Sequence, residues 1–167
     1  MSKAKLKNNM PTSQVLTFKL SDELYAFDIH RVKEVLEFKN VTPVPKSHNS
    51  MVGVINLRGH VVPVIDLKLK CGLPETIVTE ETCVIISEVK KGQDIIVMGA
   101  LADSVEEVLE YETHKLEALP KIGARLNPEY SKGMARYDNE HFFILLNVDK
   151  ILKDPSYLEV NTEAEAS

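Results

Sequence analysis

Histidine and cysteine, the residues that most often bind metals or act as nucleophiles, are few and widely spaced in this chain. The five histidines are His30, His48, His60, His114 and His141. No two of them lie three or four residues apart, the spacing that places two zinc ligands on one helix face. The two cysteines, Cys71 and Cys83, form no Cys-x-x-Cys pair, and a catalytic thiol would need an activating histidine from elsewhere in the fold. We expect no metal and no cofactor, and interpret both cysteines as reduced residues of a cytoplasmic protein.

Other patterns typical of catalysis are also missing. The sequence contains no Gly-x-Ser-x-Gly elbow and no glycine-rich phosphate loop. Adjacent carboxylates such as Glu80-Glu81 and Glu106-Glu107 lie on turns or on segments of alternating polarity. A solvated face explains them better than acid–base catalysis does. We therefore expect a protein that is not an enzyme.

Arg58 lies at the tip of an unusually apolar hairpin. The arms Val52–Leu57 and Val61–Leu67 are too apolar for strands with one wet face, so both faces should be buried. Gly59 supplies the backbone freedom that a tight reversal needs. The hairpin thus holds a long cation at a turn between core strands, which favours contact with a partner. A solvated turn residue is the alternative.

The rest of the chain consists mainly of short β-type segments. We predict strands at Val15–Leu20, Leu24–Asp28, Val35–Phe38, the two hairpin arms, Thr82–Val89, Asp94–Leu101, Val105–Tyr111, Lys132–Tyr137 and His141–Asn147. Turns recur about every ten residues, a spacing that favours all-β barrels or sandwiches. Helix is limited to single turns at Ile29–Lys33, Asp66–Cys71 and Asp149–Lys153.

An internal echo divides the sequence. Five of seven residues of Val32–Phe38 recur in Val105–Tyr111, and the strand–turn–strand pattern of Gly53–Leu69 recurs in Gly133–Leu152. Two similar β units explain both echoes, with a boundary between the units near residues 74–81. We expect residues 1–13 to be a flexible lead and residues 160–167 a flexible tail, because both lack apolar anchors.

The acidic composition argues against one further class, the nucleic-acid-binding proteins. The net charge of −5 argues against nucleic-acid binding, which needs a basic face, and aromatic residues are not grouped with basic ones. The alternative, a β-barrel that binds single-stranded nucleic acid, would be supported by salt-dependent retention on single-stranded DNA. We expect no secretory signal and no direct membrane insertion, since Asn56, Arg58 and Asp66 interrupt the longest apolar run.

Three valines, Val32, Val35 and Val105, fall within the seven-residue echo. If they point outward they form apolar patches that mark a binding site, and if they point inward they are core. The strand register decides between these alternatives, because a shift of one residue reverses the face.

Several segments together resemble the CheW family, the coupling proteins of chemotaxis. The segments are Gly53–Gly59 followed by Val61–Leu67, Leu16–Phe18, Tyr25–Ile29, Val32–Val35, Ala102–Val108, Pro128–Tyr130 and Leu145–Leu152. The resemblance implies two five-stranded SH3-like β-barrels packed around a hydrophobic seam, within one CheW-like domain over residues 14–159. It further implies a cytoplasmic adaptor, recruited to receptor arrays at the inner face of the membrane. Such adaptors bridge the cytoplasmic hairpin tip of methyl-accepting chemoreceptors and the C-terminal regulatory domain of the histidine kinase CheA.

The resemblance also assigns candidate contact residues. Asn56, Arg58 and Val105 match positions associated with receptor binding. Val32, Glu34 and Val35 match a segment used at partner surfaces, and the choice between kinase and receptor stays open, as do self-association and the pathway served. Two departures from the family pattern, Ser104 in place of glycine and a charged loop over Ala135–Glu140, could tune partner choice.

Overall fold

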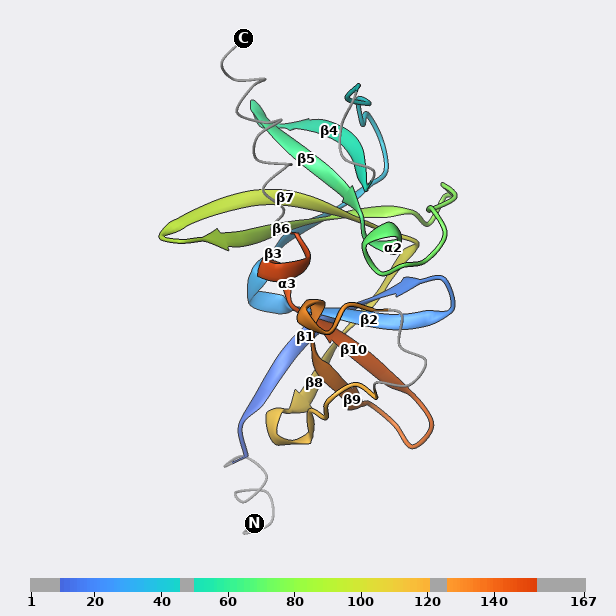
Figure 1. The fold of residues 1–167 in the computed structure, drawn as a ribbon, viewed down its shortest axis with the longest axis vertical. Coiled ribbons are helices and arrows are strands. Elements are labelled where there is room, and N and C mark those ends of the chain that lie inside the picture. The colour runs from blue at the N-terminus through green and yellow to red at the C-terminus, as the bar shows by residue number, and fades with distance from the viewer. Residues whose placement is uncertain (1–9, 46–49, 121–125, 153–167) are drawn as a thin grey trace.

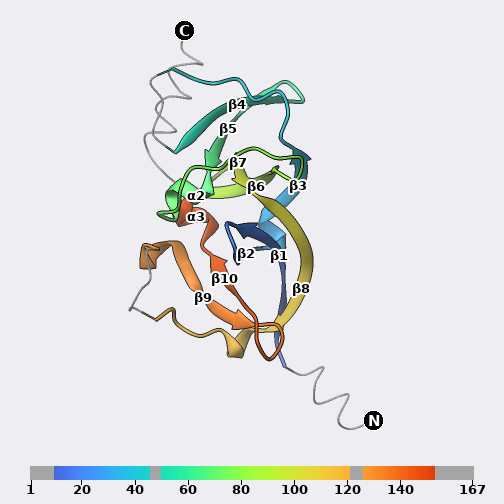
Figure 2. The same ribbon diagram turned by 90° about the vertical axis from the view of Figure 1, so that its right-hand side faces the viewer.

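The computed structural model describes residues 10–45, 50–120 and 126–152 and contains two five-stranded sheets. Figures 1 and 2 show these sheets as the upper and lower parts of the molecule. The strands are β1 (Thr12–Leu20), β2 (Glu23–Asp28), β3 (Val32–Glu37), β4 (Met51–Leu57), β5 (His60–Asp66), β6 (Cys83–Lys91), β7 (Asp94–Ala102), β8 (Ser104–Glu112), β9 (Ser131–Arg136) and β10 (Phe142–Leu146). Single helical turns are η1 (Ile29–Arg31), α2 (Leu67–Lys70), η2 (Thr113–Lys115), η3 (Pro128–Tyr130) and α3 (Val148–Ile151). The predicted all-β fold of two SH3-like barrels is confirmed.

Several predicted boundaries need correction. The helical turn expected over Ile29–Lys33 ends at Arg31, because Val32 already pairs with Ser87 as the first residue of β3. The lead expected to be flexible through residue 13 ends earlier, since Thr12 pairs with Glu112 in β1. Residues 1–9, His48 and the tail expected at 160–167 lie outside the described residues.

A hydrophobic seam between the sheets is the largest core of the molecule. It contains residues of both sheets, including Phe18 and Phe27 from one and Ile65, Ile85 and Met98 from the other. The rings of Phe18 and Phe27 meet edge to face with their centroids 4.9 Å apart. Each sheet has a smaller cluster of its own. Because their main core is shared, the two barrels bury their apolar faces against one another and form one body.

Strand β1 shows how the seam alters the expected alternation of polar and apolar faces. Leu16, Phe18 and Leu20 face the seam, but Thr17, which alternates with them, is also fully buried instead of facing water. Its hydroxyl donates to the Glu107 carbonyl over 2.7 Å and accepts from the Glu107 N–H over 3.1 Å. These bonds lie where the β1–β8 register shifts, so Thr17 completes the ladder at a bulge.

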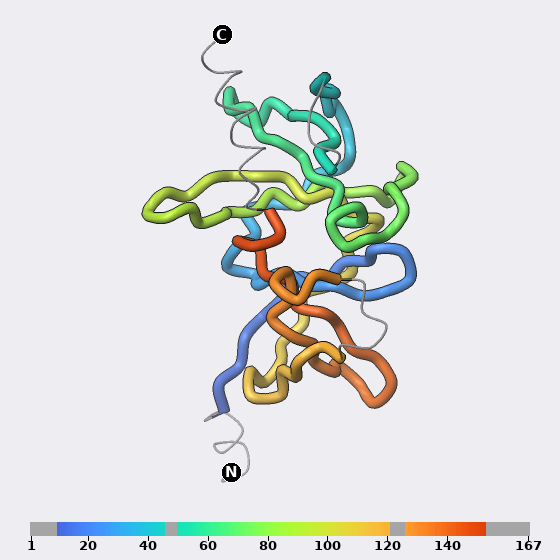
Figure 3. The backbone as a smooth tube through the Cα atoms, viewed as in Figure 1, coloured from blue at the N-terminus to red at the C-terminus, as the bar shows by residue number. Residues whose placement is uncertain are grey.

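The chain passes between the sheets twice, as the tube in Figure 3 shows. The orders of the sheets are β3-β6-β7-β5-β4 in the first barrel and β8-β1-β2-β10-β9 in the second barrel, so the chain leaves the second barrel through η1 and returns to it at Asp103. The segment 74–81 connects α2 to β6 within the first barrel. The prediction that this segment separates the two barrels is therefore wrong.

The same segment does separate two structural repeats. The two strand orders are related by a shift of five strands. If five is added to each number of β8-β1-β2-β10-β9, and ten is subtracted from any result above ten, the order becomes β3-β6-β7-β5-β4. We define the first repeat as β1 through α2 and the second as β6 through α3. Each repeat contributes its leading hairpin, β1–β2 or β6–β7, to the sheet that holds the other three strands of its partner repeat. The echo in the sequence thus marks repeats that exchange hairpins.

Matching backbone contacts support this equivalence. The Asp66 N–H donates to the Ser50 carbonyl and the Asn147 N–H donates to the Tyr130 carbonyl, each over 2.7 Å. Asp66 and Asn147 are the N-caps of α2 and α3, the last elements of the two repeats. The parallel pairs are also equivalent, since β5 lies beside β7 and β10 beside β2.

Asp149 in α3 is a partly buried carboxylate at the seam. Arg31 donates two hydrogen bonds to it, one from Nη1 over 3.0 Å, and the Lys90 N–H donates over 2.7 Å. Burial alone would raise the pKa of Asp149, but these hydrogen bonds outweigh burial and leave the pKa below its ordinary value. The folded protein therefore holds Asp149 ionised more strongly than the unfolded chain does.

We expect Asp149 to make the folded state sensitive to acid. A carboxyl whose folded pKa is lowered adds stability above its unfolded pKa, and this contribution is lost as the pH falls through the folded value. Urea denaturation from about pH 7 to about pH 3 should show Asp149→Asn less stable than the wild type near neutrality, with a difference that shrinks below about pH 4. A difference that stays constant over this range would contradict the assignment.

Candidate partner-binding surfaces

The β4–β5 hairpin is closed by a tight turn that presents Arg58. Both central residues have positive φ, 50° at Arg58 and 85° at Gly59, as a type I′ turn requires. The Asn56 side-chain oxygen accepts from the Gly59 N–H over 3.0 Å. Asn56 therefore has a local role in the turn, besides its predicted role in receptor contact.

Arg58 is paired with Glu34, which lies on edge strand β3. Its Nη1 lies 2.7 Å from Glu34 Oε2 and its Nη2 lies 3.3 Å from Glu34 Oε1, a bidentate arrangement. Because Arg58 donates these bonds, the pKa of Glu34 lies below its ordinary value, and the pKa of Arg58 is raised. The Arg58 side chain is still 70% exposed. The pair thus joins the hairpin turn to β3 while leaving the guanidinium open to a partner.

A shallow hollow lies beside this ion pair, between edge strands β3 and β4. Its volume is about 370 Å³, and it is lined by Val35, Leu36, Glu37, Lys39, Asn40, Ile55, Asn56, Leu57 and Val84. Val35 is 39% exposed. Four of the six candidate residues therefore lie together at the edge of the first barrel where β3 approaches the β4–β5 hairpin. They are Asn56, Arg58, Glu34 and Val35. We call these four residues the β3–β4 surface.

Comparison with known proteins assigns the chain to a family. Residues 14–156 match the family described as CheW-like domain. The chain belongs to this family. It is similar to the chemotaxis protein CheW of Thermotoga maritima, with 33% identity over 141 residues that cover 84% of this chain and 88% of that protein. The chemotaxis protein CheW of Klebsiella aerogenes is 29% identical over 163 residues, covering 98% of this chain and 95% of that protein.

A solved structure of the CheW family has the same fold. It is the crystal structure of the scaffolding protein TtCheW from Thermoanaerobacter tengcongensis, which matches with a TM-score of 0.74 at 28% identity. The match covers 84% of this chain and 88% of that chain. The family membership predicted from the hairpin and its companion segments is confirmed.

The other two candidate residues of the CheW resemblance lie at the seam. Val32 begins β3 and Val105 lies near the start of β8, at equivalent positions of the two repeats. Both are half-buried and pack against the shared core. The structure thus places Val105 in the other sheet from Arg58, and gives Val32 and Val105 a packing role besides any partner contact.

The second barrel presents exposed apolar residues that the sequence analysis did not single out. Val108 is the counterpart of Val35 in the seven-residue echo and is 49% exposed, and Tyr137 and Phe142 are also exposed. The echo could have identified Val108, because it aligns Val35 with Val108 directly. Tyr137 lies in the charged loop over Ala135–Glu140, and its ring stacks on His141.

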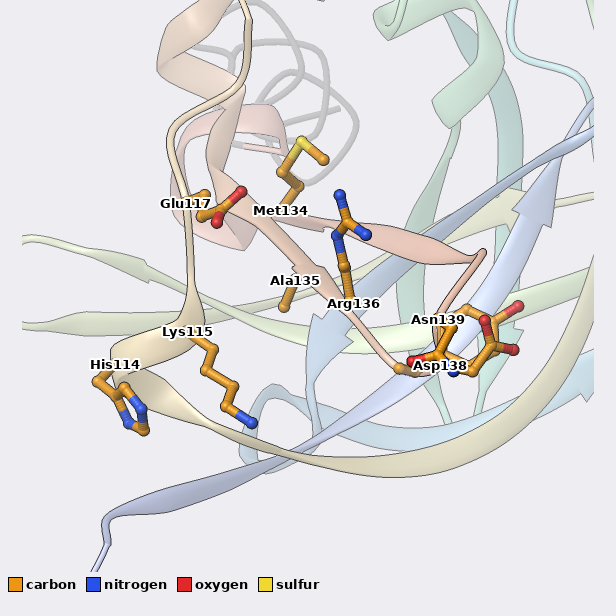
Figure 4. A pocket seen from close by; sticks show the side chains of 9 residues that line it. His114, Lys115, Glu117, Met134, Ala135, Arg136, Asp138 and Asn139 are labelled. Carbon is orange, nitrogen blue, oxygen red and sulfur yellow. The ribbon is translucent and has the colours of Figure 1, made fainter.

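A hollow of about 560 Å³ lies at the end of this second barrel (Figure 4). It is lined by His114, Lys115, Glu117, Met134, Ala135, Arg136, Tyr137, Asp138 and Asn139. The side chains come from η2, from the segment after it, and from β9 and its turn, and the polar ones dominate the view in Figure 4. The hollow carries charges of both signs.

In residues 10–45, 50–120 and 126–152, no three histidine, cysteine or acidic side chains are grouped so that they could hold a metal ion. Burial raises the pKa of the Cys71 thiol to about 12, which keeps it protonated and unreactive. His141 Nδ1 lies 2.9 Å from Asp138 Oδ2, but both residues lie on an exposed turn. Within the part of the chain that the structure covers, no helix has the length and apolar character needed to cross a membrane.

Proposed function

We propose that this chain is a non-enzymatic scaffold of a chemotaxis array. It couples the cytoplasmic tip of methyl-accepting chemoreceptors to a CheA-type histidine kinase and helps to control the activity of that kinase. The match of residues 14–156 to the CheW-like domain is the observation that carries this proposal. The relatives are named chemotaxis proteins, and the solved relative is named a scaffolding protein.

The geometry supports a positional mechanism. The β3–β4 surface offers an exposed bidentate cation beside an apolar hollow, and the shared core joins this surface rigidly to the second barrel. A rigid body that holds two partners can transmit a shift at the receptor tip as a bias between kinase states. Each contact can be weak, because many linked contacts raise the effective concentration of each partner. We propose a cytoplasmic location at the inner face of the membrane.

A ternary assembly tests the proposal. The full chain is mixed with a receptor cytoplasmic fragment and the CheA-type kinase, and co-sedimentation and kinase autophosphorylation are both measured. We expect the three proteins to sediment together and the autophosphorylation rate to change only when all three are present. Failure of the chain to bring the kinase into the pellet would contradict the proposal, as would turnover of a small molecule by the chain alone.

The exposed Val35 gives a residue-level test within this assay. We expect Val35→Asp to weaken binding to the receptor fragment or to the kinase about tenfold, because a charge would enter the apolar hollow. The melting temperature should change by less than about 2 °C, because Val35 is 39% exposed. Ile95→Asp is the matched control, since Ile95 is 60% exposed on β7 outside this hollow. Unchanged affinity for both partners would remove Val35 from the site.

A further inference from the structure

Two ion pairs close the two crossings between the sheets. At the first crossing Arg31 is paired with Asp149, and at the second the Lys68 Nζ lies 3.3 Å from Asp103 Oδ2. Exposed fractions of the side chains are 17% and 30% in the first pair and 11% and 25% in the second. Pairs with this little exposure are screened weakly by salt, and removal of one partner leaves an uncompensated charge. Both pairs therefore matter more to the fold than the exposed ion pairs do.

The first pair also binds the backbone of the leading hairpin of the second repeat. Arg31 Nε donates to the Glu88 carbonyl over 3.1 Å, and the Lys90 N–H donates to Asp149 Oδ1 over 2.7 Å. Glu88 and Lys90 lie at the end of β6 beyond its last pairing with β3. The ion pair thus forms hydrogen bonds with the Glu88 carbonyl and with the Lys90 N–H, the two groups that a neighbouring strand would otherwise bind.

At the second crossing Asp103 alone binds the leading hairpin of the first repeat, through its backbone N–H and its carboxylate. The Asp103 N–H donates to the Lys19 carbonyl over 3.0 Å, and the Ser21 N–H donates to Asp103 Oδ2 over 2.7 Å. Here too a carbonyl and the N–H two residues later are satisfied, at the end of β1. The two pairs therefore lie at corresponding places in the two repeats, although the atoms that bind the hairpin differ.

Their charges are inverted between the repeats. Arg31 and Lys68, both cations, belong to the first repeat, whereas Asp103 and Asp149, both anions, belong to the second. Lys68 and Asp149 are each the second residue of the short helix that ends their repeat, α2 or α3. Figure 2 shows both helices at the junction of the two sheets.

We propose that this sign pattern is a recognition code by which the first repeat binds the second and rejects another copy of itself. If two first repeats from different molecules exchanged hairpins, Arg31 would face Lys68 at both crossings. Two second repeats would bring Asp103 against Asp149 in the same way. Like charges in such weakly exposed sites repel strongly, whereas the apolar seam offers no comparable discrimination between the repeats. The seam thus pairs a first repeat with a second repeat, whose charges are opposite, and in the wild type that partner is the second repeat of the same chain.

The test uses two variants of the full chain. The acidic variant carries Arg31→Glu and Lys68→Glu, and the basic variant carries Asp103→Lys and Asp149→Lys. In each variant all four positions have the same sign, so neither can close on itself without repulsion. In a mixture, however, the repeats of one variant can pair with those of the other, and the segment 72–82 joins the two exchanged halves.

We expect each variant alone to melt about 10 °C below the wild type. The two variants refolded together should form a complex with one copy of each, detected by light scattering and native mass spectrometry, and this complex should melt above either variant. Lys39→Glu with Lys115→Glu is the matched control for the acidic variant, because it makes the same charge change at exposed ion pairs. It should melt within about 2 °C of the wild type.

Three results would overturn the proposal. The first is that the acidic and basic variants melt like the control. The second is that the co-refolded mixture contains only monomers. The third is that either variant forms a dimer with itself, since the code forbids pairing between repeats of equal sign. None of these measurements uses the receptor or the kinase, so their outcome is independent of the proposed function.

Discussion

Replacing Gly53 with alanine should destabilise the protein by about 3 kcal/mol or more and lower its melting temperature by about 10 °C. A Cβ at this position would lie 2.2 Å from the carbonyl oxygen of Thr42. Thr42 cannot move away easily, because its N–H and carbonyl both bond to Val54 over 2.8 Å. The close approach of the Thr42 backbone therefore explains why position 53 of the hairpin is glycine. The free energy of unfolding from urea denaturation measures the effect.

The repeat supplies a second site and a control for this prediction. Gly133→Ala should be comparably destabilising, because its Cβ would lie 2.5 Å from the Glu117 carbonyl oxygen, which accepts from the Met134 N–H. At Gly92 a Cβ would meet no atom within 4 Å beyond the adjacent residues, and only the φ of +60° opposes substitution, at a cost of about 1 kcal/mol. Equal effects at all three glycines would show that backbone conformation, and not close approach, sets the cost.

The sequence was sufficient to locate the strands but not to assign them to barrels. Strand positions follow from local patterns of apolar and turn residues, and each of the ten predicted segments corresponds to a strand. The exchange of hairpins rests instead on pairings between strands far apart in the sequence, antiparallel for β1 with β8 and β3 with β6, and parallel for β2 with β10 and β5 with β7. A repeated sequence shows that two units are similar, but it does not show whether each unit closes on itself. The segment near residues 74–81 therefore lies between the two repeats as defined above but within one barrel.

The candidate site was predictable to a similar extent. The hairpin sequence placed Arg58 at an exposed turn, because Gly59 and the apolar arms determine that turn locally. Its bidentate contact with Glu34 joins residues 24 positions apart and depends on how β3 approaches the hairpin. The burial of Val32 and Val105 could not be settled either, since a bulge shifts the register beside each of them.

Arg58→Glu should weaken binding to the receptor fragment by a factor of about 10 to 100, which corresponds to about 1–3 kcal/mol. The substitution removes a planar cation that is 70% exposed and places a second carboxylate beside Glu34. The melting temperature should change by less than about 3 °C, because an exposed ion pair contributes little to stability. Titration of the receptor fragment and thermal unfolding of the same samples measure both quantities.

Two further variants separate a specific contact from an effect of net charge. Arg136→Glu makes the same change of charge on β9, which belongs to the equivalent hairpin of the second repeat, and should alter receptor affinity less than twofold. Arg58→Lys keeps the charge but loses the bidentate fork, so its affinity should fall between those of the wild type and Arg58→Glu. Equal losses at Arg58 and Arg136 would indicate long-range electrostatics, and a large drop in melting temperature for Arg58→Glu would make the Glu34 pair structural. Glu34 already orients the Arg58 guanidinium in the free protein through two hydrogen bonds. A receptor affinity of Arg58→Lys between those of the wild type and Arg58→Glu would therefore mean that the receptor binds a guanidinium whose orientation is set before binding.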